Sequence, residues 1–261
     1  MSVSRKAATA QATPPMTLAE EGAYFQRLLA AAPKPRLNKM RPISVTFDLG
    51  APVCVTTPWV SFDGLIEHLM LLEALGSEYC LTPKKHVIRW SHSDYYIVPI
   101  KYHDGLRHAS VSQFIPGEAN LRCTTIYKRF EADRSENLKS RRVYIGHGYY
   151  RGYMLKEPYI PANQVVFYVY GDPIRIGELI DGYLIGLGND TRIGFGAIRS
   201  WRIDDTPEDW SLVRDGRAMR PIPVELCAEY EDAVPLAQRA PYWDPRNVCP
   251  CVPPGARCVL K

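Results

Sequence analysis

The sequence feature that most constrains the fold is a glycine-rich loop between a helix-like segment and a strand-like segment. It runs from Gly186 to Ala197 as GLGNDTRIGFGA, with Arg192 between two pairs of glycines and Arg199 just beyond. Glycine adopts backbone angles that other residues avoid, so such a loop can turn its N–H groups towards a phosphate. Its position after a helix and before a strand is the reverse of the known dinucleotide and triphosphate loops. A flexible connection between two core elements explains the same glycines.

Two amphipathic segments and several strand-like segments surround this loop. Apolar residues at helical spacing predict helices at 61–76 and from 173 to Gly186 or Gly188. Alternating, β-branched segments predict strands, which fall at 43–55, 94–103, 107–116, 164–171 and 197–203. The resulting order is that of an α+β, ferredoxin-like (RRM-like) domain, in which two helices cover one face of a four-stranded antiparallel sheet.

The composition divides the chain into three parts. Residues 1–40 form an N-terminal extension with a short expected helix at 18–32, and residues 41–204 form the ferredoxin-like domain. Within that domain, a segment of about 117–156 is basic and rich in tyrosine, and we expect it to project from the sheet as an inserted thumb. Residues 205–261 are rich in proline, which predicts an irregular C-terminal region.

Basic and aromatic residues gather in the loop and in the thumb. The chain has 32 Lys and Arg against 28 Asp and Glu, and this net charge of +4 does not by itself indicate a polyanionic partner. Arginine holds phosphates and aromatic rings stack on unpaired bases, so the two segments together predict a site for single-stranded RNA. A solvated charged face is the alternative. The candidate RNA-binding residues are Gly186, Gly188, Arg192, Gly194, Phe195, Gly196, Arg199, Lys128, Arg129, Arg134, Lys139, Arg141, Arg142, His147, Tyr149 and Arg151.

The cysteines near the C-terminus match a zinc site poorly. Cys249, Cys251 and Cys258, with Cys227 upstream, lack the paired C-x(2–4)-C spacing typical of structural zinc. We therefore expect reduced thiols, no metal site and no cofactor.

Histidines are the candidates for catalysis. Metal-independent RNA cleavage needs a general base near the 2′-OH. His147, which lies between glycines in the basic segment, is the best candidate, and His103 with Lys101 is the second. A paired partner for either histidine is not identifiable from the sequence.

Cysteine usage and hydropathy bear on the compartment. Seven scattered cysteines do not resemble a disulfide framework, which indicates a reducing environment. The sequence has no apolar run of the length that a membrane span needs, and its first residues do not resemble a secretory signal. We expect a cytoplasmic protein without a membrane partner.

Residues 43–203 resemble the RAMP superfamily of CRISPR proteins. The resemblance rests on the loop GLGNDTRIGFGA after the second helix, on the basic insertion between the middle strands, and on the segment PWVSFDGLIEHLMLLEALG. The C-terminal motifs RAMRPIPVEL and PYWDP resemble the subunit of type IV CRISPR effector complexes that caps the 5′ handle of the guide RNA.

The resemblance implies a non-enzymatic role. The loop from Gly186 to Gly196 would hold the backbone of the handle, and the thumb would separate the handle from the guide. The implied partners are the guide RNA, the backbone and large subunits of the complex, and target DNA with its flanking motif, reached through the complex. Some relatives cleave precursor RNA with a His, Lys and Tyr set that has no residue-by-residue match here, so this activity is not carried over from the resemblance. The alternative, which rests on His147 or His103 as the base, is a metal-independent endoribonuclease that processes precursor RNA.

Overall fold

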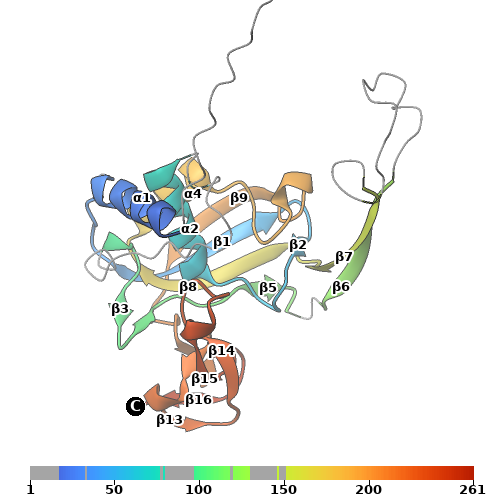
Figure 1. The fold of residues 1–261 in the computed structure, drawn as a ribbon. Helices are drawn as coiled ribbons and strands as arrows, with labels where there is room; N and C mark the ends of the chain where they lie inside the picture. The colour runs from blue at the N-terminus through green and yellow to red at the C-terminus, as the bar shows by residue number, and fades with distance from the viewer. Residues whose placement is uncertain are drawn as a thin grey trace, which may run out of the picture.

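The chain has a mixed α+β fold with mostly antiparallel sheets and few helices (Figure 1). The computed structural model describes residues 18–32, 34–76, 79, 97–117, 120–129, 146 and 151–261. Across these residues, none of the helices has the length and apolar character required to span a bilayer.

The central element is a four-stranded antiparallel sheet with the strand order β5-β8-β1-β9. Its strands are β1 (Arg41–Leu49), β5 (Gln113–Ile115), β8 (Gln164–Gly171) and β9 (Ile198–Asp205). Phe47 in the middle of β1 lies opposite Val165 of β8 and Trp201 of β9. Four of the expected strands contribute to this sheet, at 43–55, 107–116, 164–171 and 197–203. The first and second of them each divide into two strands, β1 with β2 (Val53–Cys54) and β4 (Leu106–Arg107) with β5.

Two helices cover one face of this sheet (Figure 1). They are α2 (Phe62–Leu75) and α4 (Pro173–Tyr183), and both were expected from helical spacing. The Asp172 carboxylate accepts hydrogen bonds from two amides in the first turn of α4, which fixes where that helix begins. Phe62 packs on Phe167 of β8 with ring centroids 4.9 Å apart. A third helix, α1 (Leu18–Ala31), lies beside α2 and buries Leu29 in the same core.

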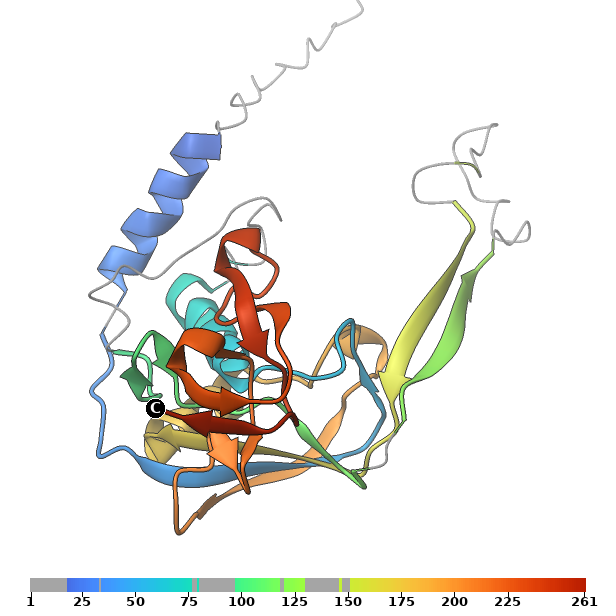
Figure 2. The same cartoon turned by 90° about the horizontal axis from the view of Figure 1, so that it is seen from below.

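A second sheet has three strands in the order β2-β7-β6. Its β6–β7 pair projects from the rest of the protein (Figures 1 and 2). It consists of β2 (Val53–Cys54), β6 (Arg122–Lys128) and β7 (Tyr153–Ile160). β6 and β7 form a long antiparallel pair whose outer part is exposed, including Tyr127 and Met154. β6 and the first part of β7 lie within the predicted thumb of about 117–156, and β7 continues past its expected end to Ile160. Residues 118–119, 130–145 and 147–150 of the thumb are outside the described residues.

The prediction of a strand over 94–103 is wrong for the described residues 97–103. Only β3 (Tyr102–His103) is a strand there, and it forms a small hairpin with β4 (Leu106–Arg107). Pro99 explains the difference, because proline cannot donate a ladder hydrogen bond in the middle of a strand. The edge position of the central sheet is taken by β5 instead.

The prediction of an irregular C-terminal region is also wrong. This region contains short antiparallel strands, which are β10 (Val213–Arg214), β11 (Arg217–Ala218), β12 (Ile222–Pro223), β13 (Cys227–Tyr230), β14 (Val234–Ala237), β15 (Val248–Val252) and β16 (Cys258–Leu260). They surround an apolar cluster of their own, with Ile222 and Val252 fully buried. Short 3-10 turns occupy Thr191–Ile193, Val224–Leu226 and Pro245–Asn247.

The register of these strands explains how they tolerate proline. Pro235 of β14 lies directly opposite Pro250 of β15. Neither residue has an N–H, so the two fit a position of the antiparallel ladder at which opposed residues exchange no hydrogen bond. A high proline content is therefore compatible with strands of this length, although it suggests a loop when only the composition is considered.

A buried arginine joins the C-terminal region to the rest of the protein. Arg220 is 1% exposed, and its guanidinium donates to the carbonyls of Ala109 at 3.2 Å and Gln238 at 2.6 Å. It also pairs with the carboxylate of Asp63 in α2 at 3.2 Å. The Tyr242 hydroxyl donates to the other oxygen of Asp63 at 2.6 Å, and burial raises the pKa of Tyr242 well above its usual value.

We predict that Asp63→Ala lowers the free energy of unfolding by about 3–5 kcal/mol, because it leaves the Arg220 charge buried without its carboxylate. The matched control is Asp205→Ala, which removes an exposed partner of Arg41 and should cost less than about 1 kcal/mol. Urea unfolding of both variants measures the difference. Equal stabilities for the two variants would contradict the assignment of Arg220 as the connection between the regions.

Candidate functional site

The glycine-rich loop between α4 and β9 packs tightly against its own chain and against β2. A Cβ atom at Gly196, where φ is +60°, would lie 1.8 Å from the carbonyl oxygen of Leu187. A Cβ atom at Gly188, where φ is +79°, would lie 2.3 Å from the carbonyl oxygen of Cys54. Gly186 is partly buried, and a Cβ there would make a tight contact of 3.0 Å with the carbonyl oxygen of Gly196. Gly188 and Gly196 are therefore required for packing, whereas a Cβ at Gly194 would meet nothing within 4 Å.

Several backbone amides of the loop already have partners inside the protein. The amide of Gly196 donates to Pro52 at 2.7 Å, and the amide of Leu187 donates to Gly196 at 2.9 Å. The amides of Asn189, Ile193 and Gly194 likewise donate to carbonyls, at 2.8 to 3.0 Å. These amides are not available to a phosphate. Binding of a polyanion at this loop would therefore depend more on side chains than it would in the amide cradle that the sequence suggests.

The outer rim of the loop is exposed and basic. Arg192, Ile193 and Gly194 face solvent, and the exposed Arg199 follows on β9. Phe195 is half-buried, and its ring lies 6.2 Å from that of Tyr159 on β7, at the base of the thumb. The rim thus exposes Arg192, Gly194 and Arg199 of the predicted residues, and Phe195 connects it to the base of the β6–β7 pair. Gly186, Gly188 and Gly196 instead serve the packing of the loop.

A cleft of about 780 Å³ lies next to this rim. It is lined in part by Asp48, Gly50, Asn163, Arg199 and Ser200, and the loop joins its edge because the Gly50 amide donates to Ala197 at 2.7 Å. Hydrogen bonds from Ser200 and Gln164 lower the pKa of Asp48, so the cleft contains a carboxylate as well as an arginine. Sequence reasoning found Arg199 but missed the polar residues that line the cleft from β1 and β8.

The described candidate residues of the thumb, Lys128, Arg129 and Arg151, lie towards the outer end of the β6–β7 pair. The Lys128 ammonium is 5.9 Å from the ring centroid of Tyr153, and the Arg129 guanidinium is 5.9 Å from that of Tyr127. Arg151 is exposed at the start of β7. The other predicted thumb residues lie outside the described residues, namely Arg134, Lys139, Arg141, Arg142, His147 and Tyr149.

The face of the central sheet opposite the helices is partly covered. Tyr168 of β8 makes an edge contact with Trp210, with ring centroids 5.5 Å apart. The Arg214 guanidinium lies 4.9 Å from the Tyr168 ring and 4.6 Å from the Trp210 ring. Trp210 and Arg214 of the C-terminal region therefore cover the Tyr168 ring, which leaves less of it open to stacking with a base.

A second group of titratable residues surrounds β3. His108 Nδ1 lies 2.8 Å from Asp209 Oδ2. Burial alone would raise the pKa of Asp209, but hydrogen bonds from His108 and Ser211 outweigh it and lower that pKa. The His103 ring lies 6.4 Å from the His108 ring. Lys101 and Tyr170 complete the group, with 4.8 Å between the ammonium and the ring centroid. The structure thus gives a carboxylate partner to a histidine that sequence reasoning did not select.

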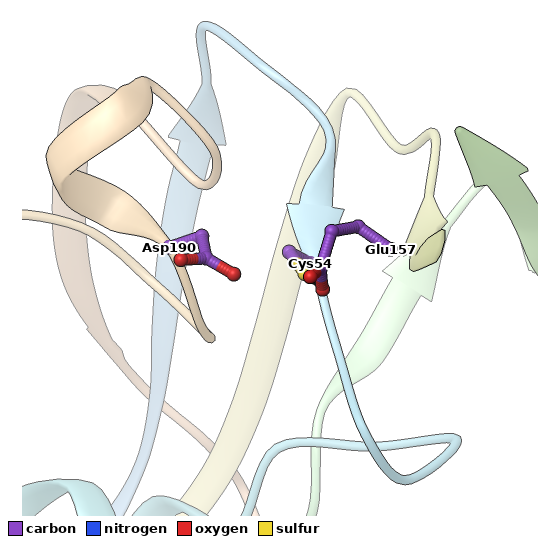
Figure 3. A group of neighbouring side chains, drawn as sticks. All are labelled: Cys54, Glu157 and Asp190. Atoms are coloured by element: carbon purple, nitrogen blue, oxygen red, sulfur yellow. The ribbon is translucent and has the colours of Figure 1, made fainter. Parts of the chain in front are cut away.

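A third group consists of Cys54, Glu157 and Asp190 (Figure 3). The Sγ atom and one oxygen from each carboxylate all lie within 4.8 Å of one another. Burial, followed by the hydrogen bond to Glu157, raises the pKa of Cys54 to about 11. None of these residues was a sequence-based candidate. In contrast, the C-terminal cysteines form two close pairs, Cys227 with Cys258 and Cys249 with Cys251, each with 3.4 Å between sulfur atoms.

Comparison with protein families identifies the class of protein. A family described as CRISPR type IV associated protein Csf3 matches residues 107–254, which include the loop, the rim and both strands of the thumb. The match spans more than half of the chain, and the chain therefore belongs to this family of type IV CRISPR-associated proteins. A search of curated proteins returned no match.

We predict that Gly196→Ala destabilises the protein by roughly 3 kcal/mol or more, because the new methyl group overlaps the Leu187 carbonyl at a positive φ. Gly194→Ala is the matched control within the same loop. It meets no atom and should cost only about 1–2 kcal/mol of backbone strain at a φ of +101°. Thermal unfolding distinguishes the two, and a Gly196→Ala protein as stable as Gly194→Ala would show that the loop is packed differently.

Proposed function

We propose that this chain is a non-catalytic RNA-binding subunit that caps the 5′ handle of the guide RNA in a type IV RNA-guided complex. The observation that carries the proposal is the exposed basic rim of Arg192 and Arg199 beside a polar cleft, at the base of the thumb. Membership in a type IV CRISPR-associated family supports a place in such a complex. The role requires binding and positioning rather than bond cleavage.

The scaffold that we propose is a ferredoxin-like domain of the RAMP superfamily. Supporting it are the strand order β5-β8-β1-β9 and the chain order in which α2 follows β1 and α4 follows β8. In this arrangement the loop after α4 leads into the edge strand β9. The cleft is lined where β1 and β5 end and β8 and β9 begin, so the rim and the cleft lie along the border at one end of the sheet. A single RNA strand can follow such a border without crossing the face covered by Trp210 and Arg214.

Phosphates would be bound mainly by arginine side chains, since several of the loop amides already have partners inside the protein. Arg192 and Arg199 would contact the handle, with Phe195 and the backbone at Gly194 beside it. Lys128, Arg129 and Arg151 would contact the RNA or the neighbouring backbone subunit further along the thumb. Tyr127 and Tyr153 are exposed, and Arg129 and Lys128 lie beside their rings. Each ring could stack with an unpaired base while the neighbouring cation contacts a phosphate.

The proposed partners are the guide RNA, the backbone and large subunits, and target DNA. Target recognition in RNA-guided complexes relies on base pairing, and protein contacts with DNA concentrate on a short flanking motif. A subunit at the 5′ end of the guide is in a position to contribute to reading that motif. We propose that this chain acts in the cytoplasm, where such complexes assemble.

We predict that Arg192→Glu and Arg199→Glu each weaken binding of the full-length protein to guide RNA and flatten its salt dependence. Each lost phosphate contact should reduce the slope of log affinity against log salt by about 0.7. The matched control is Arg257→Glu, the same charge reversal at an exposed position on the C-terminal region. Fluorescence polarisation over a salt series measures all three, and equal losses in all three variants would reject the rim as the site.

The second candidate function is a metal-independent endoribonuclease for precursor RNA. It is favoured by the group of Lys101, His103, His108, Tyr170 and Asp209, which offers a base, an acid and a cation in one place. The paired histidine, His108, is only 8% exposed, which limits its reach to a 2′-OH. His103 is exposed, but its ring nitrogen pairs with the neighbouring Asp104 at 2.9 Å.

We predict that repeat RNA remains intact when incubated with the purified protein in EDTA. Discrete fragments would instead support the enzyme, provided that they disappear in at least one of His103→Ala, His108→Gln and His147→Ala. Fragments that persist in all three variants would point to a contaminating nuclease, which the same assay with a mock purification detects.

A further inference from the structure

Three metal-ligand side chains converge where the loop, β2 and the base of the thumb meet. Cys54 comes from β2, Glu157 from β7 and Asp190 from the loop, just before the turn at Thr191–Ile193. Figure 3 shows the Asp190 carboxylate directed towards the other two side chains. Their ligand atoms all lie within 4.8 Å of one another, and Cys54 Sγ lies 3.6 Å from Glu157 Oε2.

Backbone pairing holds each of the three residues in place. The Asn189 amide donates to the Cys54 carbonyl at 2.8 Å, which fixes the loop on β2. On the other side, the Val55 amide donates to the Pro158 carbonyl at 3.0 Å, and Cys54 lies opposite Tyr159 in the ladder. The donor set is therefore built by main-chain contacts from three separate elements, and it does not depend on one flexible segment.

The charges of this group are unbalanced without a cation. Within the described residues, neither Glu157 nor Asp190 forms an ion pair, and the thiol of Cys54 is fully buried beside them. Other carboxylates of the protein have a cation in contact, as in Asp63 with Arg220 and Asp244 with Arg246.

We propose that Cys54, Glu157 and Asp190 bind a divalent transition-metal ion of the zinc class. A thiolate among the ligands favours zinc over magnesium or calcium, which prefer oxygen ligands. Zinc bonds of about 2.3 Å to sulfur and about 2.1 Å to oxygen give a tetrahedral S···O edge of about 3.6 Å, which matches the separation of Cys54 Sγ and Glu157 Oε2. Binding releases the Cys54 proton to solvent, and a water molecule completes the fourth position.

Such an ion would tie the glycine-rich loop to the base of the thumb. The loop carries Arg192, and β7 continues into the outer thumb, so the ion would fix the position of one relative to the other. None of the three ligands belongs to the basic rim, so binding of the ion can be measured without RNA.

The test is titration of the purified full-length protein with Co²⁺ alone, followed by displacement with Zn²⁺. We expect one Co²⁺ per chain with a near-ultraviolet thiolate-to-cobalt charge-transfer band, lost on adding Zn²⁺. The band should be absent in Cys54→Ser. It should persist in Cys249→Ser, the matched control from the C-terminal cysteine pair.

Two further variants keep the test decisive if Cys54→Ser folds poorly. Glu157→Gln and Asp190→Asn change half-buried side chains, and each should weaken Co²⁺ binding by at least about tenfold, since loss of an outer-shell partner alone costs about 10–100-fold. Unchanged affinity in both variants would overturn the proposal. The absence of a charge-transfer band in the wild-type protein, or a band that is lost in Cys249→Ser but kept in Cys54→Ser, would overturn it as well.

Discussion

The close approach of backbone atoms at Gly188 and Gly196 is the constraint on which the proposed site depends. Any side chain at Gly188 would collide with the Cys54 carbonyl, and any side chain at Gly196 would collide with the Leu187 carbonyl. Because glycine has no side chain, these close contacts can form, and the loop after α4 folds back and packs on β2 instead of extending into solvent. Docking places Arg192 outward, brings Asp190 to Cys54 and joins the loop to the edge of the cleft through Ala197.

Under the proposed function, this arrangement determines how the loop would bind RNA. Glycine-rich loops are commonly associated with phosphate binding through free amides, but here several of those amides hold the loop in its own fold. The glycines therefore support the site indirectly, by presenting a rigid basic rim next to the cleft. Binding of phosphates through arginine side chains is expected to weaken with increasing salt and to depend little on the RNA sequence. Both properties are expected of a subunit that binds the sugar-phosphate backbone of RNA. The nearby Cys54 group would strengthen the same junction through a metal ion.

Local patterns in the sequence predicted the elements that obey a clear period. The helices α2 and α4 and the strands β1, β8 and β9 were expected from the spacing of their apolar residues, because each directs such residues to one face. The C-terminal strands were missed, since strands of two to five residues interrupted by proline leave no period to detect. Long-range features were also missed: Arg220 is a charged residue in a core, and Cys54, Glu157 and Asp190 are distant in sequence. The glycines signalled a close approach, but the sequence does not say what approaches.

The central claim is that the rim of the loop contacts the 5′ handle of the guide RNA. The most direct measurement is site-specific photocrosslinking in the reconstituted complex, with a photoreactive residue at Ile193, which is 55% exposed between Arg192 and Gly194. The same residue at Val259, which is 42% exposed on the C-terminal region, serves as the reference. The account predicts crosslinks from position 193 that map to handle nucleotides, and few from position 259. Crosslinking at position 193 that does not exceed the reference, or that maps away from the handle, would contradict it.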